Sequence, residues 1–129
     1  MNVQSEITYF SEMGFSDKAR LLASFLSELA TEARATYGAS QEAVHDGGHL
    51  RFVNEMTQRV AKLIEQFLAD DKARPTDEVV LRMLLSPRAD KVAEKMIHTA
   101  YRRALQNFER YDTTVFMNSE VLLLSGVNV

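Results

Sequence analysis

The sequence contains no cysteine and no tryptophan, and only seven of its 129 residues are glycine or proline. Without cysteine, the chain cannot form disulfides, thiolate nucleophiles or cysteine-ligated zinc and iron–sulfur sites. The scarcity of glycine and proline excludes collagen-like and low-complexity disordered classes. Hydrophobic residues make up 46% of the chain and charged residues 26%. This composition is typical of a globular protein, and the length suits a single domain.

Long hydrophobic runs are also missing. The longest uninterrupted one is residues 121–124, and runs such as residues 79–81 are shorter, whereas a helix that spans a bilayer needs about 20 apolar residues. The first ten residues have neither the basic start nor the apolar stretch of a signal peptide. We therefore expect a cytoplasmic protein with no membrane partner.

Between the few glycines and prolines, apolar residues recur at spacings of three and four, which is typical of amphipathic helices. The pattern predicts helices over residues 3–13, 17–37, 49–70, 76–85 and 87–111. Ser86 and Pro87 would begin the last of these, as N-cap and first helical residue. Residues 45–48 are interpreted as a loop, because two glycines in a helix interior cost about 2 kcal/mol relative to alanine. The expected fold is an all-α bundle of four to five helices.

The predicted helix at 49–70 carries apolar residues on two faces. One row keeps an alternating spacing of three and four, and comprises Leu50, Val53, Thr57, Val60, Ile64 and Phe67. The second row comprises Phe52, Met56, Leu63 and Phe67. A helix of this kind is either central in a bundle or covers both its own core and a partner. We predict that Phe52, Met56 and Leu63 contribute to an interface between two copies.

The C-terminal stretch differs in character from the rest of the chain. Residues 113–129 are rich in β-branched and aliphatic types and carry one charged residue, Glu120. Exposed apolar surface of that size favours association, so we expect this tail to dock on the bundle of residues 1–112 or on a partner subunit. The alternation of apolar positions favours an extended segment over a helix. The tail residues assigned to the predicted interface are Phe116, Leu122 and Leu124.

The residues best suited to bind a metal ion or take part in catalysis are Glu42, His45, Asp46 and His49. A Glu and a His three apart share a helix face, as in carboxylate-bridged di-metal bundles. Such sites need the pair twice, and no second copy occurs. Residues 46–49 could instead form an anion site at a helix start, but no strand or lysine accompanies them. We expect a capped loop with no metal and no cofactor, and keep a metal-dependent enzyme or metal-binding protein as the alternative.

Charge is distributed unevenly along a chain whose net charge is −3. Residues 1–50 carry three basic and seven acidic side chains, whereas residues 82–110 carry seven basic and three acidic ones. The basic face of residues 88–110 makes a nucleic-acid-binding regulator the second alternative. The acidic net charge and the lack of a glycine turn between residues 76–86 and 87–111 argue against it.

Taken together, these patterns favour a small cytoplasmic helical protein that acts through protein–protein interaction, as an adaptor, regulator or inhibitor. We expect it to form a homodimer. No serine–histidine–carboxylate arrangement can be assigned from three histidines, so we assign no catalytic residues and favour an interaction role over an enzymatic one. The identity of a protein partner does not follow from the sequence.

Overall fold

The computed structural model describes residues 2–37 and 47–124. Within these residues it contains five helices and no strand: α1 (Val3–Ser11), α2 (Phe15–Tyr37), α4 (Gly47–Leu68), α5 (Asp77–Leu85) and α6 (Lys91–Leu124). The predicted all-α class with four to five helices is therefore confirmed.

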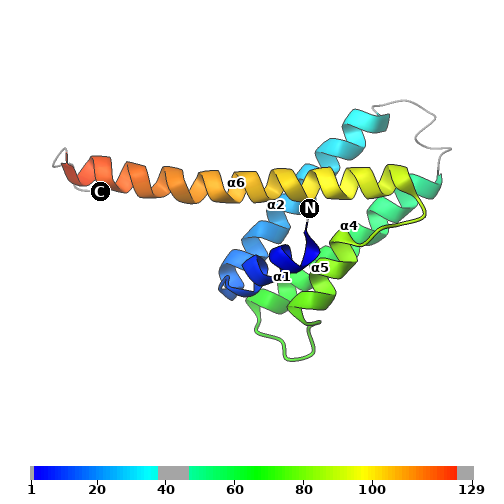
Figure 1. Cartoon of the computed structure of the whole chain (residues 1–129), viewed down its shortest axis with the longest axis horizontal. Helices are drawn as coiled ribbons and strands as arrows, with labels where there is room; N and C mark the ends of the chain where they lie inside the picture. The colour runs from blue at the N-terminus through cyan, green and yellow to red at the C-terminus, as the bar shows by residue number, and fades with distance from the viewer. Residues whose placement is uncertain (1, 38–46, 125–129) are drawn as a thin grey trace.

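Helix α2 lies at the centre of the arrangement, because it packs against both α4 and α6. Figure 1 shows α2 and α4 side by side in opposite directions, with α6 crossing them. The two short helices α1 and α5 pack against each other, and α5 also contacts α6. The core therefore lies between three long helices and is completed by the two short ones.

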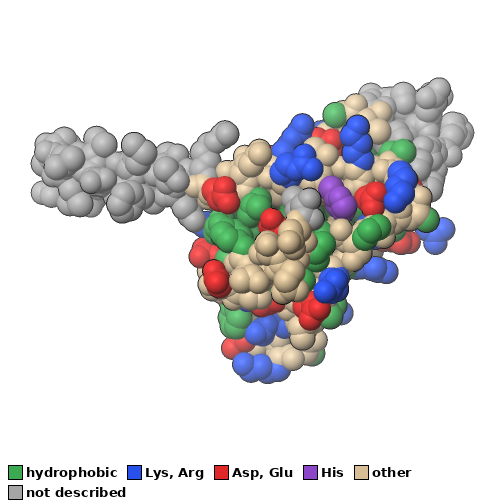
Figure 2. All heavy atoms as spheres, viewed as in Figure 1, with side chains coloured by type: hydrophobic (Ala, Val, Ile, Leu, Met, Phe, Trp, Pro, Cys, Tyr) green, Lys and Arg blue, Asp and Glu red, His purple; other side chains and the backbone are tan. Residues whose placement is uncertain are grey.

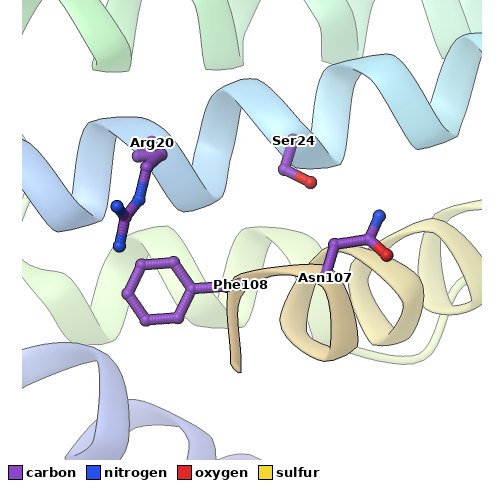
Figure 3. A pocket seen from close by; sticks show the side chains of 4 residues that line it. All are labelled: Arg20, Ser24, Asn107 and Phe108. Carbon is purple, nitrogen blue, oxygen red and sulfur yellow. The ribbon is translucent and has the colours of Figure 1, made fainter. Parts of the chain in front are cut away.

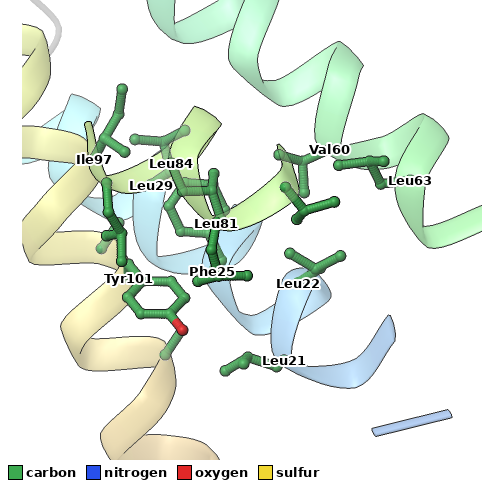
Figure 4. Packing of buried hydrophobic residues seen from close by; sticks show 14 of the residues in the cluster. Leu21, Leu22, Phe25, Leu29, Val60, Leu63, Leu81, Leu84, Ile97 and Tyr101 are labelled. Atoms are coloured by element: carbon green, nitrogen blue, oxygen red, sulfur yellow. The ribbon is translucent and has the colours of Figure 1, made fainter. Parts of the chain in front are cut away.

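Each helix contributes one apolar face to this core, as the spacing of three and four predicts. Figure 4 shows side chains of α2, α4, α5 and α6 meeting there. The fully enclosed aliphatic and aromatic members include Leu22, Phe25, Leu29, Val60, Leu81, Leu84, Ile97 and Tyr101. The buried residues of α6 also include the small side chains Ala93, Ala100 and Ala104.

The start of α6 corrects the sequence prediction. The helix begins at Lys91 rather than at Pro87, and Asp90 caps it by accepting hydrogen bonds from the backbone of Val92 and Ala93. Ser86 is instead the extended C-cap of α5. Arg88 holds the connecting loop, because its guanidinium donates to the Met83 carbonyl.

The end of α6 also differs from the prediction. Residues 113–124 continue α6 as a helix to Leu124, and the helix passes residue 112 without a break. The extended conformation favoured by the alternation of apolar residues is therefore not found there. Adding residues to an existing helix fixes one residue per hydrogen bond, whereas a strand needs a partner strand. Residues 125–129 of the predicted tail lie outside the described residues.

The start of α4 lies two residues before the predicted one. Gly47 and Gly48 form its first turn and do not interrupt its interior. The prediction that they belong to a loop at 45–48 is therefore wrong for these two residues. In the first turn the backbone N–H groups have no intrahelical partner in any case. The helix ends at Leu68, and Asp70 follows in the left-handed region with φ of 49°.

Candidate functional site

The structure does not describe the side chains of the four residues predicted as metal candidates, so it places no metal site there. Glu42, His45 and Asp46 lie outside the described residues, and His49 is described only as part of the α4 backbone. Within residues 2–37 and 47–124, no group of three or more His, Asp or Glu side chains comes together in a way that could hold a metal ion.

The predicted interface residues of α4 belong to the core of the chain itself. Met56 and Leu63 are buried, and Phe52 is half-buried against the core. The Arg88 guanidinium carbon lies 4.9 Å from the centre of the Phe52 ring. The two apolar rows of α4 are therefore both occupied within one chain, and an interface role for these residues stays a prediction.

The remaining predicted interface residues, Phe116, Leu122 and Leu124, lie in the C-terminal part of α6. The last α6 side chain in the described core is Phe108. We call residues 109–124 the α6 arm. Figure 1 shows this arm running beyond the other helices. Seven hydrophobic residues lie between Val115 and Leu124 of this arm.

A hollow lies at the base of the α6 arm, between α2 and α6. It has a volume of about 230 Å³ and is lined by Arg20, Ser24, Asn107 and Phe108. Figure 3 shows the Arg20 guanidinium beside the Phe108 ring, and the guanidinium carbon lies 4.5 Å from the ring centre. Sequence reasoning missed this α2/α6 hollow, because its two walls are more than 80 residues apart in the chain.

Opposite charges hold α2 and α6 together beside this hollow. Asn107 donates a 2.8 Å hydrogen bond to the Glu28 carboxylate, and Arg103 pairs with Glu32. The acidic first part of the chain thus meets its basic later part within one molecule. The exposed face in Figure 2 carries acidic and basic side chains interspersed. The basic residues predicted as a nucleic-acid surface are therefore partly neutralised by their own chain.

A second polar group that the sequence analysis missed is Lys18, a buried lysine on α2. Its side chain is 6% exposed, and its Nζ lies 2.9 Å from the Asp77 carboxylate at the start of α5. The ammonium also faces the rings of Phe10, Phe15 and Phe67, at 5.4–5.7 Å from their centres. A signal was present, because Lys18 lies four residues before Leu22 on the apolar stripe of α2.

Burial also isolates the hydroxyl of Tyr101 on α6. The side chain is fully buried beside the Glu6 carboxylate, and its hydroxyl forms no well-aligned hydrogen bond. Burial raises the pKa of Tyr101 above its ordinary value of 10, and the nearby negative charge of Glu6 adds to the shift. One oxygen of Glu6 is likewise buried without a hydrogen bond. The Nε2 atom of His98, one turn earlier on α6, is also buried without a partner.

We predict that Tyr101→Phe stabilises the chain by about 1 kcal/mol at neutral pH, because it removes a buried donor that lacks a partner. Above pH 10 the unfolded tyrosine loses its proton while the folded one keeps it, so the unfolded state binds fewer protons and stability falls as pH rises. The advantage of the variant should therefore grow above pH 10. Urea unfolding at several pH values measures this, with Tyr9→Phe as the control because Tyr9 is 37% exposed. An unchanged or lower stability of Tyr101→Phe would contradict it.

No helix in the described part of the chain is long and apolar enough to cross a membrane. The chain matches no protein-family model, no curated protein and no solved structure. The features of the chain that bear on its function are the long helix α6 and the hollow between α2 and α6.

Proposed function

We propose that this chain is a small protein–protein interaction module, of the adaptor, regulator or inhibitor type, that forms a homodimer through the α6 arm. The observation that supports the proposal is the length of α6, whose backbone continues as a helix to Leu124 through the apolar residues 115–117 and 121–124. The cysteine-free composition fits the cytoplasmic location that we propose with it.

The physical argument concerns the stability of the arm as a helix. A helix of about 12–15 residues is marginal in water, and most helical stability in proteins comes from packing an apolar face. The arm has sixteen residues, and its second half includes the run Val121 to Leu124. Burying four such side chains is worth on the order of 6–10 kcal/mol before entropy is subtracted. A second copy supplies a surface with the same apolar character.

Sedimentation of the full chain tests the proposal. At micromolar concentration we expect a species of about twice the chain mass of 14.6 kDa. Leu122→Lys should shift this species to the monomer, because the charge would be buried in the interface. The matched control is Leu68→Lys, which makes the same change at a residue that is 65% exposed on the bundle. A full chain that stays monomeric at high concentration would contradict the proposal.

A further inference from the structure

We infer that the first half of α6 binds an acidic amphipathic helix of a partner protein. The partner helix lays carboxylates along a basic stripe on α6 and places an aliphatic side chain in the groove beside that stripe. The basic stripe comprises Lys91, Lys95, His98 and Arg102. This surface lies outside the α6 arm, so the inference deepens the proposed interaction role and does not depend on the homodimer.

The basic stripe follows from helical spacing. Its members lie four, three and four residues apart, which places them within about 60° of one another around the helix and along about 17 Å of its axis. Lys91, Lys95 and Arg102 are exposed, and His98 is half-buried between them. In Figure 2, basic side chains gather over this part of α6. The first three turns of the helix therefore present a narrow line of basic side chains to solvent.

Two cations of the stripe are not neutralised by the chain itself. Lys91 pairs with Glu94 at 3.3 Å. Within the described part of the chain, Lys95 and Arg102 form no ion pair. A partner that brings carboxylates opposite these two side chains gains attraction without displacing an existing contact, and such attraction is stronger in a partly dehydrated interface than at a free surface.

An apolar groove lies beside the stripe, between α6 and α2. It has a volume of about 420 Å³ and is lined by Glu32, Thr36, Lys91, Val92, Lys95 and Met96. Val92 is 42% exposed, and the methylene stems of the two lysines extend the apolar surface around it. Glu32 is already paired with Arg103, so its charge opposes an acidic partner only weakly. An aliphatic side chain placed in this groove would remove Val92 from water.

The stripe and the groove together define the chemistry of the partner. Lys95 contributes to both, because its ammonium belongs to the stripe and its side chain lines the groove. A helix that carries an aliphatic residue with carboxylates three or four positions away matches this arrangement, since residues at these spacings share one face. About twelve residues of such a helix reach from Lys91 to Arg102.

A nucleic acid fits this surface less well. Its backbone supplies phosphates but no aliphatic group for the groove, and single strands need exposed aromatic side chains on which bases stack. Between residues 91 and 109, the aromatic residues of α6 are Tyr101 and Phe108, and both are buried. The net charge of −3 also opposes a polyanion at long range. An acidic helix is therefore the favoured partner, and DNA is a competing outcome of the test.

Binding of a synthetic helix to the full chain tests the inference. The probe is a fluorescent peptide of about 15 residues, or four helical turns, with leucine on one face and glutamate at spacings of three and four beside it. A second peptide has glutamine in place of each glutamate. We expect the glutamate peptide to bind about tenfold more tightly at low salt, and its affinity to fall when salt screens the charges. Equal affinities of the two peptides, or no binding of the glutamate peptide, would overturn the inference.

Charge reversal locates the binding surface. Lys95→Glu should raise the dissociation constant of the glutamate peptide about tenfold or more, because it replaces an attraction by a repulsion. The matched control is Lys62→Glu, the same change at an exposed lysine of α4. Equal dissociation constants for these two variants would show that the peptide does not bind along the stripe and would overturn the inference.

A second pair of variants tests the groove. Val92→Ser should raise the dissociation constant about fivefold, because less apolar surface is buried on binding. The control is Val79→Ser, at a residue of α5 that is 54% exposed, and it should leave binding unchanged. Equal effects of the two serine variants would overturn the docking of an aliphatic side chain beside Val92.

Two further measurements exclude the competing occupants. A DNA duplex of about 20 base pairs should bind more weakly than the glutamate peptide at the same salt concentration. Tighter binding of DNA that is lost in Lys95→Glu would overturn the inference. Lys95→Glu should sediment like the natural chain, and loss of a dimer in this variant would show that a second copy covers the stripe. A natural chain that is monomeric and still binds the peptide would contradict only the proposed homodimer.

Discussion

Replacing Asp77 by alanine is expected to lower the free energy of unfolding by about 3–5 kcal/mol, because it leaves the Lys18 ammonium buried without its charge partner. The Lys18 side chain is 6% exposed, and its Nζ lies 2.9 Å from the Asp77 carboxylate. The three surrounding phenylalanine rings attract a cation only weakly, with on the order of 1 kcal/mol for each well-placed ring. They cannot replace the carboxylate.

Removing the other partner should have a much smaller effect. Lys18→Met puts an unbranched apolar side chain among the three rings, where methionine packs well. Asp77 keeps part of its solvation, because its side chain is 25% exposed, and it lies in the first turn of α5, where the helix dipole favours a negative charge. We expect Lys18→Met to change stability by less than about 1 kcal/mol in either direction, as seen when buried ion pairs are replaced by apolar groups.

Chemical denaturation of four variants measures the asymmetry. Glu78→Ala is the matched control, because Glu78 is the next acidic residue of the same helix turn and pairs with Arg82 at the surface. Its loss should cost only a few tenths of a kcal/mol. The double variant Lys18→Met with Asp77→Ala should recover most of the stability lost in Asp77→Ala alone. A loss in Asp77→Ala no larger than that in Glu78→Ala would contradict the burial of the lysine.

The lysine also illustrates where sequence reasoning reaches its limit. The stripe of Lys18, Leu22, Phe25 and Leu29 has strict helical spacing, so the buried position of residue 18 was visible in the pattern. The pattern could not predict the charge partner of Lys18, because Asp77 follows 59 residues later in another helix. A lysine on an apolar stripe is usually placed with its charge in water. Only the packing of α5 against α1 and α6, which brings Asp77 to Lys18, identifies the carboxylate.

Helix interiors were predictable, whereas several helix ends were not. The long apolar periodicities located α2, α4 and α5 to within two residues, since burial of one face dominates their stability. Both Ser86–Pro87 and Asp90 are valid start signals for α6. In the structure α6 begins after Asp90, and Arg88 in the preceding loop contacts Met83 and Phe52. These tertiary contacts are not encoded in local sequence preferences.

The end of α4 shows the same limit. The acidic pair Asp70–Asp71 places unfavourable charge at the negative end of this helix. The observed stop is a hydrogen-bonded motif, in which the Asp71 N–H donates to the Gln66 carbonyl and the Asp70 N–H to the Phe67 carbonyl. This motif needs a left-handed residue, usually glycine. Asp70 takes that conformation and binds Arg74 through its side chain.

The candidate site could be predicted only in part. The apolar character of residues 113–124 follows from composition, and with it the expectation that they associate, because exposed apolar surface favours contact. Their helical conformation did not follow, since alternating positions over so few residues fit a strand as well. The α2/α6 hollow depends on the crossing of two helices, which brings Arg20 against Phe108. No local pattern in the sequence encodes that crossing.

The largest loss of stability is expected from a charge placed in the centre of α4. Val60 is fully buried in the core, on α4, which packs against α2. Val60→Asp would bury a carboxylate without a partner, which costs well over 4 kcal/mol and is a large part of the 5–15 kcal/mol that stabilises a typical domain. We expect this variant to be unfolded or partly unfolded at room temperature, as seen by loss of helical circular dichroism.

Two further variants of α4 make the prediction quantitative even when Val60→Asp does not fold. Val60→Ala keeps the core apolar and should cost about 2 kcal/mol through lost burial and a small cavity. Ala61→Asp introduces the same carboxylate one residue later, at an exposed position, and should change stability by less than about 0.5 kcal/mol. Ala61 lies about 100° around the helix from Val60. The difference in stability between Val60→Asp and Ala61→Asp therefore reports which face of α4 is turned toward the core. Equal losses in Val60→Asp and Ala61→Asp would mean that α4 does not present Val60 to the core.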